Sequence, residues 1–172
     1  MGSNHRRKVR TIKQLIVIIL LITTLVLGFR AYDQHLAEQK IWRAHFVSSD
    51  GKRSPEYRLE LANTPAQRQL GLMYRKAGSM AADEGMVFVF PGEQLHGFWM
   101  KNTFLPLDMI FLDQNLQIVG IEANAAPLSE EPRGPATPAK YVIELNSGIT
   151  AKDGIKEGAK AVFARALPPG ER

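Results

Sequence analysis

The chain has 172 residues, no cysteine and a formal net charge of +5. Lack of cysteine excludes a disulfide framework, a thiol nucleophile and a thiolate metal site. Residues 1–14 hold five cations and no acidic residue, so they account for the whole excess charge, and the rest of the chain is neutral. A neutral domain offers no basic patch for nucleic acid, and we expect no such partner.

The N-terminal segment predicts export or membrane attachment. Residues 1–14 form a basic tail, and residues 15–31 form an apolar segment with no charge between Lys13 and Arg30. The positive-inside rule keeps such a tail in the cytoplasm and places the following domain on the extracytoplasmic, periplasmic side. The segment is therefore predicted to be a transmembrane helix or a signal, and the membrane is its expected partner.

Retention and cleavage of this segment are both open. The run from Leu15 to Phe29 is short for a spanning helix, which typically needs about 17–25 residues, and this favours a cleaved signal. No A-x-A site follows the run, and this favours a retained single-pass anchor. Cleavage would instead leave a secreted or periplasmic protein.

A spacer is expected over residues 32–41, followed by a domain over 42–167 and a short tail over 168–172. Strands are predicted at 42–47 and at 57–61, where apolar and polar residues alternate. A helix over 65–74 follows, because Thr64 is a good N-cap and Pro65 suits the first helical position.

After Gly78 the pattern is again that of short strands. They are predicted at 86–90, 95–100, 109–112, 117–122, 141–145 and 161–164. Many short strands with one short helix predict a mostly β, compact, antiparallel domain of jelly-roll-like or barrel-like type.

The chain lacks the usual sequence signs of metal and nucleophile chemistry. His35, His45 and His96 are not paired at a ligand spacing, so no metal and no cofactor is expected. No serine lies in a G-x-S-x-G turn.

The densest polar and aromatic cluster is the stretch 96–108. A predicted strand over 95–100 places Trp99 and Lys101 on one face, and Asn102 and Asp108 are close in sequence. This combination resembles the lining of a pocket for a small polar ligand. The structural alternative is that the aromatic residues fill the core, Asn102 shapes a turn and Asp108 accepts backbone N–H groups.

Three further charged residues are candidates for the same site. Arg68 and Arg75 could offer guanidinium donors to a ligand or could be solvated helix residues. Glu144 lies in an apolar strand and needs a partner if it faces inward. Alternatively, Asp108 and Glu144 could act together as acid and base in a hydrolase.

Two sequence blocks resemble the DUF192 family. They are the R-x-x-G-L-M-x-R block from Arg68 to Arg75 and the F-W-M-K-N-T block from Phe98 to Thr103, and the resemblance spans roughly residues 45–165. It implies a compact, mostly antiparallel β domain of jelly-roll-like type, often behind an export signal, without an assigned biochemical role. Many relatives carry a cysteine in the loop that corresponds to 127–138, and this chain has none there.

The leading functional hypothesis is an extracytoplasmic domain that binds a small polar ligand or an envelope component. The candidate ligand-binding residues are Arg68, Arg75, Trp99, Lys101, Asn102, Asp108 and Glu144. The alternatives are a hydrolase that uses a carboxylate base, and a structural or partner-docking module.

Overall fold

The computed structural model describes residues 18–32 and 40–172. The chain divides into two units, residues 1–40 and 41–172, which we describe separately. In the first unit the described residues 18–32 are helical, and the predicted basic tail and most of the spacer lie outside the described residues.

Within the two described ranges, we find no helix that is long and apolar enough to cross a membrane. The predicted membrane segment begins at residue 15, which the structure does not describe, so it stays a prediction.

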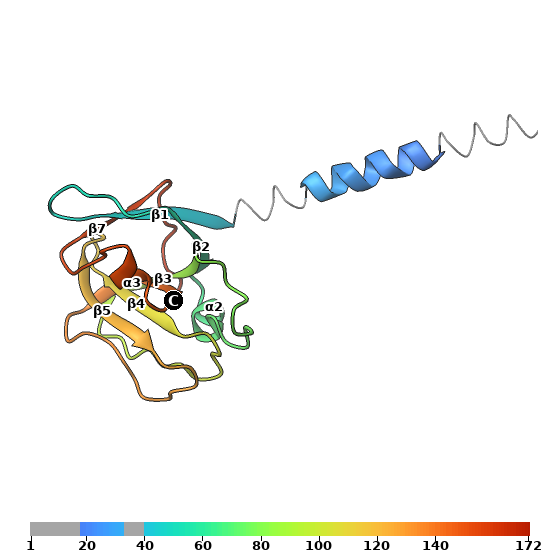
Figure 1. Cartoon of the computed structure of the whole chain (residues 1–172). Helices are drawn as coiled ribbons and strands as arrows, with labels where there is room; N and C mark the ends of the chain where they lie inside the picture. Colours follow the sequence, from blue (N-terminus) through green and yellow to red (C-terminus); the bar gives the residue numbers. More distant parts are fainter. Residues whose placement is uncertain (1–17, 33–39) are drawn as a thin grey trace, which may run out of the picture. The chain divides into compact units, whose positions relative to one another are not determined.

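The second unit is built on one sheet of seven strands in the order β5-β4-β6-β3-β2-β1-β7 (Figure 1). The strands are β1 Ile41–Val47, β2 Tyr57–Ala62, β3 Glu84–Gln94, β4 Leu107–Leu112, β5 Ile118–Ala125, β6 Ala139–Asn146 and β7 Lys160–Phe163. Two short helices, α2 Pro65–Leu70 and α3 Ile149–Lys152, complete it. The predicted mostly β class is confirmed.

Strand pairing is antiparallel except between β2 and β3, which run parallel. A parallel pair needs a long crossover connection. The connection here contains α2 and the segment that follows it, which lie against one face of the sheet.

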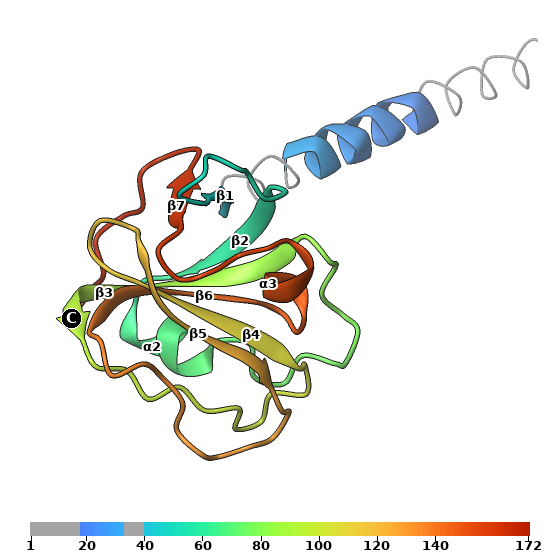
Figure 2. The same cartoon turned by 60° about the vertical axis from the view of Figure 1, so that its left-hand side comes forward.

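The sheet curls into a half-barrel (Figure 2). Its two edges approach each other where Gln117 and Lys160 form an isolated bridge. The Ile118 amide donates to the Ala159 carbonyl at 2.8 Å, and the Ala161 amide donates to the Leu116 carbonyl at 2.9 Å. These bonds satisfy part of the edge that an open sheet leaves unpaired.

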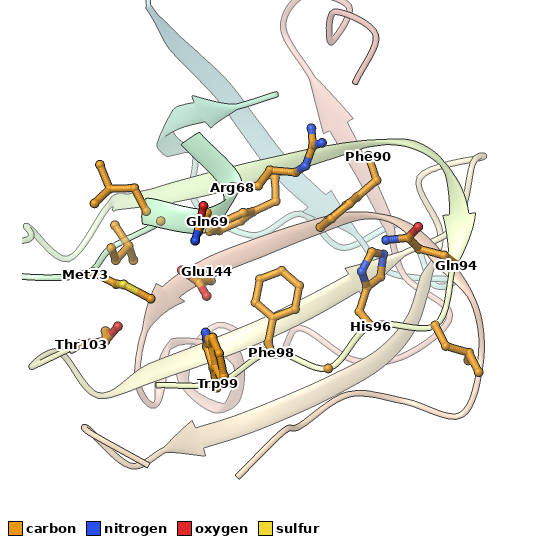
Figure 3. A pocket seen from close by; sticks show the side chains of 16 residues that line it. Arg68, Gln69, Met73, Phe90, Gln94, His96, Phe98, Trp99, Thr103 and Glu144 are labelled. Carbon is orange, nitrogen blue, oxygen red and sulfur yellow. The ribbon is translucent and has the colours of Figure 1, made fainter. Parts of the chain in front are cut away.

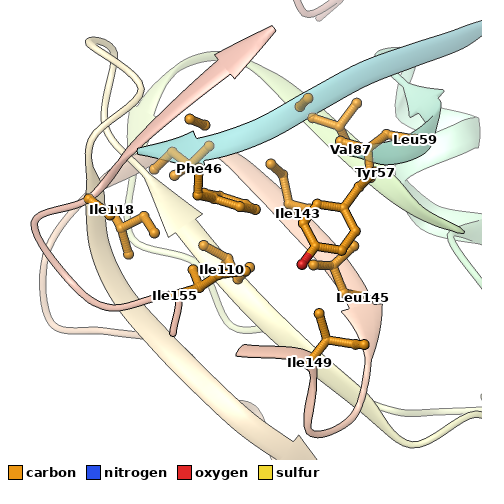
Figure 4. Packing of buried hydrophobic residues seen from close by; sticks show 14 of the residues in the cluster. Phe46, Tyr57, Leu59, Val87, Ile110, Ile118, Ile143, Leu145, Ile149 and Ile155 are labelled. Atoms are coloured by element: carbon orange, nitrogen blue, oxygen red, sulfur yellow. The ribbon is translucent and has the colours of Figure 1, made fainter. Parts of the chain in front are cut away.

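Two apolar clusters lie on opposite faces of the central strands. The first includes Ile143 and Leu145 of β6 and contacts α3 (Figure 4). The second includes Val142 of β6 together with Leu72 and Met80 from the β2–β3 crossover. Because side chains alternate along a strand, Glu144 lies on the face of the second cluster.

One predicted strand is wrong. Residues 95–100 form no strand, and their ladder contact is a single isolated bridge between Phe98 and Arg133. The Met100 amide instead bonds the Ser129 carbonyl at 2.7 Å, so the segment runs along a loop and not along a neighbouring strand. Trp99 and Lys101 therefore do not share a strand face as predicted, because no strand is present here.

The predicted helix over 65–74 is shorter than expected, and α3 was not predicted. The helix α2 ends at Leu70 because Gly71 has φ +47° and leaves the helical conformation. The four residues of α3 are too few to give a helical pattern of apolar residues.

Candidate functional site

A cleft of about 350 Å³ opens on the face of the second apolar cluster (Figure 3). One wall comes from α2 and the residues after it, the other from the end of β3 and the irregular segment that follows, and β6 contributes Glu144. The lining residues are Arg68, Gln69, Leu70, Gly71, Leu72, Met73, Phe88, Phe90, Gln94, Leu95, His96, Gly97, Phe98, Trp99, Thr103 and Glu144.

The first wall is held by a capping box at the start of α2. The Thr64 hydroxyl accepts from the Gln67 amide at 3.2 Å, and the Gln67 side chain accepts from the Thr64 amide at 3.1 Å. These bonds satisfy amide groups that the first turn leaves without a helical partner.

Gly71 brings the chain close to the sheet after α2. A Cβ atom at this position would lie 3.2 Å from the Phe88 ring, and the φ of +47° disfavours other residues. The glycine thereby lets Leu72 enter the core and Met73 reach the cleft.

Arg68 ties this wall to the sheet and to the C-terminal segment. It donates to the Val89 carbonyl at 3.0 Å and to the Glu171 carbonyl at 2.7 Å, and it also bonds the Asn63 carbonyl. Its guanidinium lies 5.1 Å from the centre of the Phe90 ring. Arg68 is thus an anchor that forms part of the wall, and its guanidinium points away from Glu144 (Figure 3).

Glu144 is the acidic residue of the cleft. It is 5% exposed and lies between Met86 on β3 and Met109 on β4 in the strand register. Among the described residues, no hydrogen bond or ion pair to the Glu144 carboxyl is found, and its oxygens are not among the fully enclosed atoms that lack a partner, so the carboxyl opens into the cleft. Burial raises the pKa of Glu144 to about 8, and the charge of Arg75 opposes this shift. The carboxyl is therefore mostly protonated at pH 7.

Arg75 leaves Glu144 without a direct partner because it is bound elsewhere. Its two terminal nitrogens each lie 2.7 Å from a carboxylate oxygen of Glu60. This bidentate pair raises the pKa of Arg75 and largely compensates its charge. Arg75 does not line the cleft.

His96 contributes a neutral imidazole to the second wall. Its Nε2 lies 2.8 Å from the Ala139 carbonyl oxygen, which can only accept, so Nε2 carries the proton. Burial, with a smaller contribution from Arg68, lowers the pKa of His96. Nδ1 is therefore an unprotonated acceptor at neutral pH.

Aromatic rings make up much of the remaining lining. Phe98 packs edge-on against Phe88 at 5.2 Å and against Phe90 at 6.2 Å between ring centroids. Trp99 is 48% exposed, and Leu70 and Leu95 are also exposed apolar lining residues. The rings are thus fixed inside the cleft, while apolar side chains remain accessible to solvent.

Of the seven predicted ligand-binding residues, the structure brings Arg68, Trp99 and Glu144 together in the cleft. Lys101 lies 5.4 Å from the Trp99 ring and 3.6 Å from Glu130, outside the cleft lining. Asn102 also lies outside the lining.

The backbone at Asn102 turns with φ +53°, and its side chain donates to the Tyr74 hydroxyl at 3.0 Å. The Tyr74 amide donates to the Asn102 carbonyl at 2.7 Å. The two walls are thereby joined at one end of the cleft.

Asp108 lies on the other face of the sheet from Glu144. In the register Asp108 opposes Leu145, whereas Glu144 opposes Met109. The Asp108 carboxylate accepts from the amides of Asn124, Gly148 and Thr150 at 2.9, 3.1 and 2.9 Å. It also accepts from the Thr150 hydroxyl at 2.7 Å. The structure therefore places Asp108 in a buried scaffold, and the two carboxyls do not meet as an acid–base pair.

Several lining residues were not among the predicted site residues. His96 begins the predicted polar and aromatic cluster but was not a predicted ligand-binding residue, and Gln69, Gln94 and Phe90 were not singled out. No local motif marks them, because they are brought together by the crossover and by the irregular segment after β3. Among the described residues, no group of three or more His, Asp or Glu side chains is placed to hold a metal ion.

Comparison with known proteins gives one family match and two solved relatives. The model of the DUF192 family, described as "Uncharacterized ACR, COG1430", matches residues 46–163. A Sinorhizobium meliloti protein, provisionally described as a transcription regulator, is 38% identical with a TM-score of 0.67. It covers 72% of this chain, and 94% of its own chain is matched.

A protein of unknown function from Novosphingobium aromaticivorans is also 38% identical, with a TM-score of 0.65. It covers 71% of this chain, and 84% of its own chain is matched. Among curated proteins none matches this chain.

Proposed function

The chain belongs to the DUF192 family, and we propose that its β domain binds a small molecule in the cleft between α2 and the segment after β3. The observation that carries the proposal is the buried Glu144 carboxyl, which has no partner among the described residues and lines an accessible cleft. Burying a polar group without a partner costs free energy. A ligand group that bonds to Glu144 would recover part of that cost.

The size and lining of the cleft fit this role. Small-molecule sites are typically about 300–1,000 Å³, mostly apolar, with a few placed polar groups. Here Phe88, Phe98 and Trp99 supply apolar surface, and Glu144 and His96 supply hydrogen-bonding groups. The ligand would present a ring or alkyl face to the aromatic walls and a polar group to Glu144.

A thermal-shift screen of the full chain against a fragment library tests the proposal. Hits are retested on Glu144→Gln and on Glu157→Gln, a matched change at an exposed turn residue. We expect cleft ligands to lose their stabilising effect on Glu144→Gln and to keep it on Glu157→Gln. A screen in which every hit stabilises all three proteins equally would contradict the proposal.

We also propose that the domain acts on the extracytoplasmic side, held by its N-terminal segment. The support is the basic tail in front of an apolar run without a clear cleavage site. Because the natural chain has no cysteine, Glu157→Cys creates a single thiol. A membrane-impermeant maleimide is expected to label this thiol in cells with a permeabilised outer membrane. Labelling only after lysis of the inner membrane would contradict this placement.

A second candidate function is proton transfer by Glu144. The pKa of about 8 places this carboxyl where one group can both accept and donate a proton near neutral pH. This version of the hydrolase hypothesis does not need Asp108. Turnover of ester or glycoside substrates by the natural chain, lost in Glu144→Gln, would favour it over binding alone.

A further inference from the structure

The cleft is lined by one acidic residue and one basic residue, and the basic residue is bound elsewhere. Glu144 is the one acid among the lining residues, and Arg68 is the one Lys or Arg. Three of the donor contacts of Arg68 go to backbone carbonyls, and its guanidinium points away from Glu144 (Figure 3). Apart from Arg68, the side chains that line the cleft with Glu144 are therefore uncharged at neutral pH.

The other groups that face Glu144 from neighbouring elements do not supply an unpaired positive charge. Arg75, whose charge acts on Glu144, is held by both oxygens of Glu60 and also lies in the field of Glu84. His96 is neutral, and Gln69 and Thr103 carry no charge. A ligand cation would thus meet one carboxyl that no protein cation holds.

The aromatic rings of this site already attract cations. The Lys101 ammonium lies 5.4 Å from the Trp99 ring, and the Arg68 guanidinium lies 5.1 Å from the Phe90 ring. The electron-rich face of a ring attracts positive charge, most strongly for tryptophan, and a nearby carboxylate adds to this attraction. Phe98, which has no such cation among the described residues, lines the same cleft as Glu144 (Figure 3).

We propose that the cleft takes a small organic cation, an alkylammonium or quaternary ammonium compound, with its charged end between the Glu144 carboxylate and the Phe98 and Trp99 rings. This inference rests on the proposed binding function and names the ligand class. A buried carboxylate is costly without a counter-charge, and a cationic ligand supplies the counter-charge. An anionic ligand would meet the same carboxylate as a repulsive charge.

Binding of such a cation would release a proton. Glu144 is mostly protonated at neutral pH because it is buried, and the cation favours its ionised form. Affinity is then expected to rise by up to about tenfold per pH unit between about pH 6 and pH 8, and to level off above the free pKa. Burial lowers the pKa of His96, so this imidazole is neutral at the upper end of this range.

The test uses choline and benzyltrimethylammonium as cationic probes and 3,3-dimethylbutan-1-ol as the neutral counterpart of choline. Binding to the full chain is measured by titration calorimetry at pH 6, 7 and 8. Fluorescence of Trp99 in a Trp42→Phe variant, which removes the other tryptophan from β1, gives a second readout at the cleft.

We expect the cations to bind at least about tenfold more tightly than the neutral alcohol and to quench Trp99. The pH dependence should disappear in Glu144→Gln, with at least about a tenfold loss of affinity, because the amide cannot ionise. Glu157→Gln should bind as the natural chain does.

Equal binding of choline and the alcohol, or pH-independent binding, would overturn the inference. If neither cation binds but fragments from the thermal-shift screen bind in a Glu144-dependent manner, the ligand class is wrong and the proposed binding function stands. If neither the cations nor any fragment occupies the cleft, both fail.

Discussion

At the scale of single residues, Glu144 and Asp108 are two buried carboxyls of the same sheet that differ in their hydrogen bonding. Asp108 accepts four hydrogen bonds, whereas Glu144 has no partner among the described residues. A fully bonded carboxylate fits a scaffold, and an unpaired one in an open cleft fits a binding site.

Glu144 is expected to make stability depend on pH. Its pKa rises from 4.5 to about 8 on folding, so the folded state holds the proton while the unfolded state has lost it. Between these pH values the free energy of unfolding falls as pH rises, by at most about 1.4 kcal/mol per unit from this group. Denaturant unfolding at pH 5 to 8 should show this slope in the natural chain, and a flatter profile in Glu144→Gln. The same slope in both proteins would contradict the assignment.

Asp108 is expected to matter for stability and not for ligand binding. Asp108→Asn removes the charge that four donors contact, and it should lower the free energy of unfolding by about 2–4 kcal/mol. Denaturant unfolding gives this change, and titration with any cleft ligand should give an unchanged affinity per folded molecule. A large loss of affinity with unchanged stability would place Asp108 in the binding site after all.

At the scale of elements, the cleft depends on the crossover between β2 and β3. The capping box starts α2, Gly71 ends it against Phe88, and Arg68 fastens it to β3. All three features fix the position of the same wall of the cleft, the one formed by α2 and the residues after it.

Thr64→Ala removes the hydroxyl of the capping box and should cost about 1 kcal/mol in the free energy of unfolding. Because α2 forms one wall, the affinity of a cleft ligand should fall as well. Thr64→Ser keeps the hydroxyl and serves as the control in both measurements. Loss of stability in Thr64→Ser equal to that in Thr64→Ala would show that the hydroxyl is not the cause.

The elements also show which structure the sequence could predict. Alternation and turn residues predicted the positions of β1, β2, β4 and β6 closely, because each strand buries alternate or all side chains in a local pattern. The segment 95–100 has a similar pattern but bonds a distant loop, and local sequence does not specify such a partner.

The candidate site was predictable only in part for the same reason. Arg68, Trp99 and Glu144 stood out as charged or aromatic residues in distinctive blocks, and they meet in the cleft. Lys101 and Asn102 follow Trp99 in sequence, but the turn at Asn102 directs them to other partners. The sequence alone does not show that Glu144 and Asp108 lie on opposite faces of the sheet. That placement follows from the register between β4 and β6.

At the scale of the whole molecule, the curled sheet separates structural and functional roles. Its first apolar cluster fills the half-barrel (Figure 4), and the second supports the cleft on the opposite face. A mostly β domain with an accessible, aromatic-lined cleft suits recognition of a small molecule. The neutral charge of the chain beyond residue 14 fits a small-molecule ligand better than a nucleic acid.

A crystallographic fragment screen tests the central claim most directly, because it shows where small molecules bind. The account predicts that bound fragments collect in the cleft, with a polar or charged group against Glu144 and apolar groups against Phe98 and Trp99. Crystals of Glu144→Gln should lose the charged fragments from this position. Fragments that collect at other surfaces while the cleft stays empty would contradict the account.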